Sequence, residues 1–257
     1  MVRETLLCVL TTTSICFGQS PTTETTSTFG NFVDNISVDE NFSLINYKGS
    51  SLPNGNTTLI QFIQGVDYKI SDSFSIGLDI PVYVSDATDF GAIETTLTWS
   101  AGSAWKNADM TLDLGVGVSS PMETVFGASS VDPSLSGVFT YNLPWASLQF
   151  VQGVNYEFVT GDAYSLPFGS KVSDDILTAD TSVYYPVSGE LKLGGTVLQN
   201  YTVVNDGQQN ISVGPNLAWN ITNNVNLNGG VSIPVYQNVN NSAEQNYVMS
   251  ASLAIKF

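Results

Sequence analysis

The chain has 257 residues, of which 42% are hydrophobic and only 12% are charged, and this length fits a single domain. Its formal net charge of −16 excludes nucleic acid as a partner, because phosphates require a basic surface. No run of about 18 apolar residues occurs, so a membrane-spanning helix is not expected.

Residues 1–18 have the parts of a secretory signal peptide: Arg3, an apolar run that ends at Phe17, and the small residue Gly18. Cleavage near Gly18 would remove both cysteines, so no disulfide or thiol chemistry is expected in the mature chain. A lipoprotein signal at Cys16 is the alternative, although the residue before it, Ile15, is bulky. Residues 19–40 are interpreted as a polar tail, with a plug that enters a lumen as the alternative.

From residue 57 to the end, segments of about ten residues alternate apolar with small or polar side chains, as strands that cross a membrane do. The clearest segments are 57–70, 74–84, 92–100, 110–118, 135–143, 148–158, 175–187, 190–201, 209–221, 224–237 and 246–257. An even number of strands requires one more, for which 41–47 is the only candidate. We therefore predict an all-β fold, an antiparallel up-and-down transmembrane β-barrel of about twelve strands over residues 41–257. A soluble β-sandwich is the alternative, since alternate residues there also face a core.

The connections are predicted to alternate strictly between short turns and long loops, which would place the C-terminus in the periplasm. The last strand resembles the closing strand of Gram-negative outer-membrane barrels, because its apolar residues recur at every second position and end on a terminal Phe. Four of these residues are interpreted as an assembly signal: Tyr247, Leu253, Ile255 and Phe257. The resemblance implies export to the cell outer membrane, with lipid and the barrel-assembly machinery as partners.

Aromatic residues are expected at the membrane interface on the periplasmic side. They are Tyr68, Phe74, Trp99, Tyr141, Trp145, Tyr185, Trp219 and Phe257. The same alternation predicts charged residues in the lumen. They are Asp67, Asp79, Glu94, Asp113, Glu157, Asp180 and Glu190, with Lys69, Lys192 and Lys256 near the periplasmic end. An open lumen of this kind would favour cations, whereas in a filled interior the carboxylates would only be hydrated or hydrogen-bonded.

The absence of histidine argues against the outer-membrane enzymes that use it as a general base. The sequence Ser103-Ala104-Trp105-Lys106 matches an SxxK motif but has no supporting motif. Calcium binding by the acidic pairs Asp86 and Asp89, or Asp174 and Asp175, is an alternative to solvated loops. We expect no enzymatic activity, no metal site and no cofactor.

Two segments share a local pattern, Gly77-Leu78-Asp79-Ile80-Pro81-Val82-Tyr83 and Gly230-Val231-Ser232-Ile233-Pro234-Val235-Tyr236. Together with Gly214-Pro215-Asn216-Leu217 ahead of Trp219, and with the terminal Lys256-Phe257, this pattern resembles the meta-pathway phenol-degradation-like transporters of the outer membrane. The resemblance implies passage of small compounds, hydrophobic ones included. We therefore expect a channel or transporter for the passive passage of small hydrophobic or cationic solutes. A closed barrel that serves as a surface anchor, adhesin or receptor is the alternative.

Overall fold

The computed structural model describes residues 35–48, 56–84, 88–91, 93–100, 110–119, 131–143, 145–161, 163–165, 170–172, 174–203, 207–238 and 244–257. The predicted signal peptide and residues 19–34 of the predicted tail lie outside these ranges. Residues 34–257 group into one unit. No helix among the described residues is long and apolar enough to cross a membrane.

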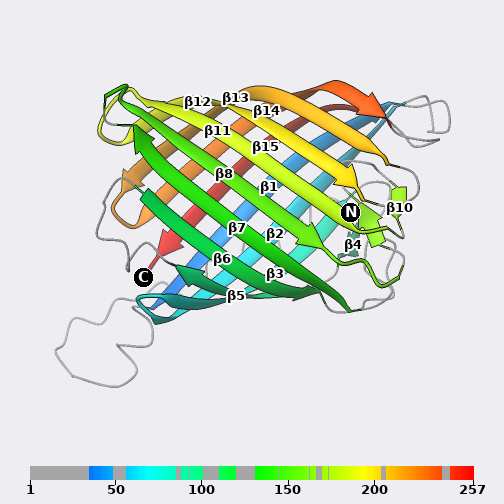
Figure 1. Ribbon diagram of the computed structural model, residues 1–257, viewed down its shortest axis with the longest axis horizontal. Helices are drawn as coiled ribbons and strands as arrows, with labels where there is room; N and C mark the ends of the chain where they lie inside the picture. Colours follow the sequence, from blue (N-terminus) through cyan, green and yellow to red (C-terminus); the bar gives the residue numbers. More distant parts are fainter. Residues whose placement is uncertain are drawn as a thin grey trace. The chain divides into compact units, whose positions relative to one another are not determined.

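Twelve long strands of the described residues form a closed antiparallel barrel (Figure 1). They are β1 (Ile36–Lys48), β2 (Asn56–Ser71), β3 (Phe74–Val84), β5 (Glu94–Ser100), β6 (Met110–Ser119), β7 (Asp132–Leu143), β8 (Leu148–Glu157), β11 (Ile176–Pro186), β12 (Leu191–Thr202), β13 (Gln209–Thr222), β14 (Val225–Asn238) and β15 (Glu244–Lys256). Each strand pairs with its neighbours in chain order, and β1 pairs with both β2 and β15. The prediction of a twelve-stranded up-and-down barrel is confirmed.

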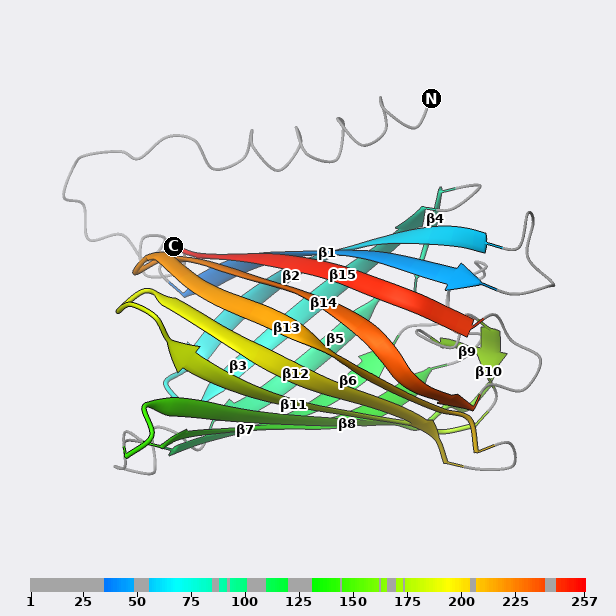
Figure 2. The ribbon, with the colours of Figure 1, turned by 90° about the horizontal axis from the view of Figure 1, so that it is seen from above.

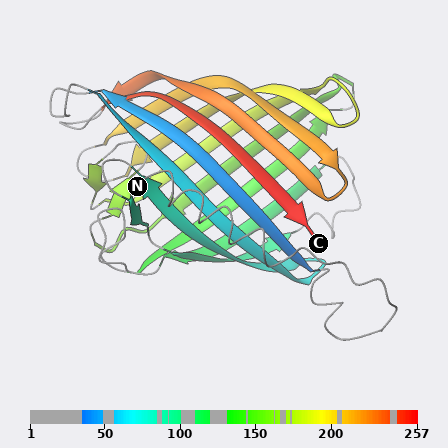
Figure 3. The ribbon, with the colours of Figure 1, turned by 180° about the vertical axis from the view of Figure 1, so that it is seen from behind.

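The first and last strands lie side by side and close the barrel, as Figure 3 shows. Their pairing runs from Ser37 opposite Lys256 to Lys48 opposite Glu244. At the end of the ladder the backbone N–H of Phe257 donates to the carbonyl of Ile36 at 3.1 Å. We call this end of the barrel, where β2 meets β3 and β13 meets β14 through tight turns, the turn end; the opposite end is the loop end.

Three short strands are additional to these twelve (Figure 2). β4 (Thr88–Phe90) pairs with the last residues of β3. β9 (Ala163–Ser165) and β10 (Ser170–Val172) pair only with each other. All three fall within segments that the sequence predicts to be loops, and they are too short to show a two-residue alternation.

The first strand begins at Ile36, earlier than the prediction of 41–47. The alternation of β1 does extend back through Val38. It is hard to recognise in the sequence, because the charged Glu40 occupies an outward position where an apolar residue is expected. The boundary of the predicted tail at residue 40 therefore falls inside β1.

The prediction that connections alternate strictly between short and long is wrong at β5 and β6. Residues 101–109 separate these two strands, a longer connection than 203–208 or 239–243 at the loop end. Across these strands Ser100 pairs with Asp113, and the turn that Gly102 and Ser103 suggest at 101–103 lies outside the described residues.

Candidate lumen and solute pathway

The two faces of the barrel differ in chemistry. On β2 and β3, Val66 and Leu78 are 41% and 40% exposed, and they alternate with the half-buried Asp67 and Asp79. The same alternation exposes large apolar side chains on other strands, among them Leu97, Val116, Leu135, Val154, Val183, Leu193, Val213, Ile233 and Met249. Apolar residues therefore face outward, and small, polar and acidic residues face the lumen.

Four carboxylates from four adjacent strands share one part of the lumen, which we call the acidic wall: Asp39 on β1, Asp67 on β2, Asp79 on β3 and Glu94 on β5. In the ladder Asp39 pairs with Gly65, Gly65 pairs with Asp79, and Asp79 pairs with Glu94. Asp79 lies near enough to the other three for electrostatic repulsion. Sequence reasoning missed Asp39, because it fell in the range assigned to the tail.

Carboxylates in the lumen lie over glycines of neighbouring strands. Both carboxylate oxygens of Asp39 lie 2.5–2.6 Å from the point that a Cβ on Gly65 would occupy. The same relation holds for Asp67 over Gly77, Glu94 over Gly117, and Asp180 over Gly153. A glycine in a strand often marks such a close approach. The glycines let these side chains lie flat along the wall instead of projecting into the bore.

Other predicted lumen carboxylates lie further round the barrel. Glu157 on β8 pairs with Ser134, whose hydroxyl donates to Glu94 Oε1 at 3.2 Å, so Ser134 links Glu157 with the acidic wall. Glu157 and Glu94 also repel each other electrostatically. Asp180 lies on β11 opposite Gly153, and Asp113 lies on β6 opposite Ser100 and Val138.

The three lysines predicted to face the lumen lie near the turn end. Lys69 Nζ forms an ion pair with Asp72 Oδ1 at 2.7 Å, and hydrogen bonding to Lys69 together with its charge lowers the pKa of this turn carboxylate. Lys192 Nζ donates to Gln149 Oε1 at 2.9 Å. Lys256 and Lys69 line a cavity of about 620 Å³ beside the turn at 71–75.

Glu190 lies outside the strands. It belongs to the turn between β11 and β12, where its Oε2 accepts a hydrogen bond from the Ser188 hydroxyl at 3.1 Å. The predicted lumen charge at this position is therefore an exposed turn carboxylate rather than part of the strand wall.

Hydroxyl and amide side chains line the lumen from β11 round to β1. Ser182 and Thr196 hydroxyls are 2.7 Å apart, and the Asn216 amide donates to both. A cavity of about 400 Å³ lies against these side chains, and none of the described residues that line it is charged. Its lining includes Asn41, Ser43, Tyr184, Leu198, Asn228, Val248 and Ser252. The lumen thus has an acidic wall over β1, β2, β3 and β5, and a cavity mainly on other strands whose uncharged lining includes some apolar surface.

An apolar cluster also lies on the inner face. Ile45, Tyr47 and Leu59 are each at most 3% exposed, and Tyr83 and Val248 pack against them. The residues belong to the halves of β1, β2, β3 and β15 nearer the loop end. Neither Ile45 nor Leu59 was expected inside, because an apolar residue in a barrel strand is expected to face lipid.

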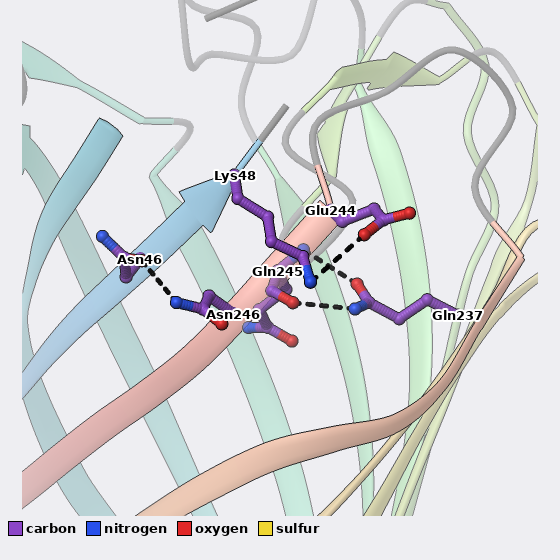
Figure 4. Close-up of polar contacts among 6 residues, drawn as sticks. All are labelled: Asn46, Lys48, Gln237, Glu244, Gln245 and Asn246. Carbon is purple, nitrogen blue, oxygen red and sulfur yellow. Dashed lines mark hydrogen bonds and ion pairs between the residues drawn. The ribbon is translucent and has the colours of Figure 1, made fainter. Parts of the chain in front are cut away.

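The loop end of the seam between β1 and β15 is held by polar side chains, as Figure 4 shows. Lys48 and Glu244 form an ion pair at 3.5 Å, and Asn246 donates to Asn46 at 3.1 Å. On the other side of β15, the ladder with β14 ends at Ser232 opposite Val248. Beyond this point the Gln237 amide bonds both the N–H and the carbonyl of Gln245, at 2.8 and 2.7 Å, and so bridges the two strands.

The predicted interface aromatics all lie on strand segments or turns near the turn end. Six are exposed: Phe74, Trp99, Trp145, Tyr185, Trp219 and Phe257. Tyr68 and Tyr141 are partly buried. Three of the predicted assembly residues, Tyr247, Leu253 and Ile255, lie on β15 and pair with Asn46, Glu40 and Val38 of β1, and the fourth, Phe257, directly follows β15. Their role in assembly stays a prediction.

Asp175, considered above for calcium binding, has other partners. Its oxygens accept hydrogen bonds from the Tyr156 hydroxyl at 2.7 Å and from the Val159 N–H at 3.1 Å, so it closes the loop that follows β8. Within the described ranges no group of three or more Asp, Glu, His or Cys side chains could hold a metal ion. Asp86 and the Ser103–Lys106 motif lie outside those ranges.

No family model and no curated protein matches the chain. Solved structures do match, and the three named here each cover 86% of this chain. They are the COG4313 outer membrane channel from Pseudomonas putida F1 (10% identity, TM-score 0.62, 95% of that chain covered), the NanC porin (10%, 0.56, 100%) and the KdgM porin in complex with disordered oligogalacturonate (9%, 0.51, 99%). The chain has the fold of an outer-membrane β-barrel. At these identities the likeness concerns the fold alone, so the resemblance to the phenol-degradation-like transporters stays a prediction.

Proposed function

We propose that this chain is a passive outer-membrane channel for small solutes that prefers cations. The observation that supports the preference is the acidic wall of Asp39, Asp67, Asp79 and Glu94, which Glu157 extends. Charged rings and walls set ion selectivity at close range, because they attract counter-ions into a confined bore. The lumen lysines Lys69, Lys192 and Lys256 do not offset this charge at the wall, since they lie near the turn end.

Localisation to the outer membrane and the absence of enzymatic activity belong to the same proposal. The fold is shared with proteins whose names describe them as porins or channels, and the signal-like residues 1–18 are consistent with export. With the turn end in the periplasm, solutes would enter at the loop end and leave beside Lys69 and Lys256.

The lumen also favours a class of solute. A cationic group would lie along the acidic wall, while the inner cluster of Ile45, Tyr47 and Leu59 and the Tyr184 and Leu198 side chains offer apolar contact on other strands. We propose small organic cations that carry an apolar part as the solutes that pass best. Anionic solutes would be repelled.

The test is conductance of the refolded chain, residues 19–257, in a planar bilayer, with the reversal potential measured under a potassium chloride gradient. We expect steady openings and a cation-selective reversal potential that moves toward zero in Asp39→Asn and Asp79→Asn. Glu190→Gln is the matched control, because it removes one carboxylate in an exposed turn and should leave selectivity unchanged. An equal effect of all three variants would refute the role of the acidic wall. Silence from folded protein would favour a closed barrel that acts as an anchor, adhesin or receptor.

A further inference from the structure

Two polar side chains interrupt an apolar stretch of the outer face, which runs from Val38 to Leu44 on β1 and from Ile60 to Val66 on β2. Glu40 and Gln64 are paired directly across these strands. Along the strands, Glu40 has Val38 and Phe42 as its outward neighbours, and Gln64 has Phe62 and Val66. The next strands add Leu253 beside Glu40 and Ile80 beside Gln64. The pair is thus a polar island among apolar outward residues; Figure 3 shows β1 and its neighbouring strands from the outside.

The island lies at the depth of the lipid hydrocarbon. Glu40 is four residue steps from Ile36 at the turn end. This distance is about 13 Å along the strand, or about 10 Å along the membrane normal at a typical barrel tilt. The outward apolar band of such barrels is about 25 Å tall. Phe42 and Leu44 continue the outward face above Glu40. A carboxyl group at this depth is unfavourable, and ionisable residues within membranes are normally found facing a polar partner.

Another outward polar pair shows what a self-sufficient arrangement looks like. Thr181 donates to Gln152 Oε1 at 2.6 Å, and the Gln152 amide donates to the Asp180 carbonyl at 2.8 Å and the Gly153 carbonyl at 3.1 Å. In contrast, the side chains of Glu40 and Gln64 make no hydrogen bond or ion pair within the part of the chain that the structure describes. Their polar atoms are free to bind a group outside the barrel.

We propose that this face of β1 and β2 is a self-association surface, on which a second copy of the chain packs. In such a dimer a two-fold axis runs along the membrane normal beside the island. Two identical surfaces that face each other about this axis have left and right exchanged, so Glu40 of each copy lies opposite Gln64 of the other. The Gln64 amide then donates to the Glu40 carboxylate in both directions. Phe42 and Phe62, which contact edge to face with ring centroids 5.2 Å apart, supply the apolar surroundings.

Cross-linking between copies tests the proposal. Residues 19–257 contain no cysteine, so Val66→Cys places a single thiol beside the island. In lipid vesicles, a short bismaleimide should convert this variant to dimers. Val154→Cys, on the outer face of β8, is the control for random collisions and should give far fewer dimers.

The proposal requires that the polar pair holds the dimer together. Glu40→Leu in the Val66→Cys background should weaken dimerisation by about tenfold, and Gln64→Leu should do the same. Both changes replace a polar group in lipid with an apolar one, and heat-modifiable gel migration checks that the variants are folded. Equal cross-linking at Val66→Cys and Val154→Cys would overturn the proposal. Unchanged dimers in Glu40→Leu, or capture only of a different membrane protein in native outer membranes, would also overturn it.

Discussion

Gly65→Ala is the substitution that most directly tests how the acidic wall is held. A Cβ at Gly65 would lie 2.5 Å from Asp39 Oδ1, whereas ordinary contact begins near 3.4 Å, so the carboxylate has to move by about 1 Å. The strand backbone lies behind it, so the side chain is displaced toward the bore. Overpacking costs about 1–3 kcal/mol in general, and the lower limit applies because the clash is with the end of a side chain. Replacing glycine recovers about 0.4–1 kcal/mol from the unfolded chain. We therefore expect a small change in stability and a clear fall in conductance.

Single-channel recording separates these effects. Conductance of Gly65→Ala should fall while cation selectivity is kept, because a carboxylate moves into the bore without losing its charge. Gly195→Ala is the control: Gly195 faces outward, and the nearest atom to its added Cβ is 3.8 Å away. Adding Asp39→Ala to Gly65→Ala should restore the conductance of Asp39→Ala alone. The reasoning is refuted if Gly65→Ala and Gly195→Ala behave alike.

Two further predictions concern the ends of the barrel. Gln237→Leu removes both hydrogen bonds that bridge β14 to Gln245, so the free energy of unfolding should fall by about 1–3 kcal/mol. Hydrogen exchange of the Gln245 backbone amide should become faster. Gln199→Leu, on the outer face of β12, is the control and should leave that exchange unchanged. Lys69 lowers the pKa of Asp72. The contribution of this ion pair to the stability of the fold is therefore complete above the ordinary pKa of Asp, and it is lost as the pH falls through the lowered pKa. Lys69→Met should return the Asp72 pKa, followed by NMR titration, to its ordinary range; a titration that does not move would contradict the assignment.

Much of this architecture follows from a two-residue period. Because every second side chain of a barrel strand meets lipid, the outward residues Val66, Leu78 and Val116 identify their strands, and their neighbours Asp67 and Asp79 must then face inward. This rule gives a wrong strand boundary where a polar residue lies at an outward position. Glu40 interrupts the outward apolar residues of β1, so the sequence pattern predicts too late a start for the strand and leaves Asp39 out of the predicted lumen.

Other features depend on register, which the sequence does not specify. The contact of Asp39 with Gly65 needs β1 and β2 to be paired in one particular alignment, and a shift by a single residue would turn Gly65 away. Ile45 and Leu59 lie inside by the alternation that turns Leu44 and Ile60 outward, although their apolar side chains alone would predict a position against lipid.

The pairing of carboxylate with glycine connects two properties that would otherwise oppose each other. An acidic wall attracts cations more strongly as its side chains approach the solute, but each side chain that projects also narrows the bore. With Gly65, Gly77 and Gly117 beneath Asp39, Asp67 and Glu94, the charge lies close to the backbone and the bore keeps its width. Asp79 lies near the three other carboxylates of the wall, so its charge adds to all of theirs. For this reason we expect Asp79→Asn to reduce selectivity more than Asp39→Asn does, whereas Gly65→Ala should bring the Asp39 carboxylate further into the bore.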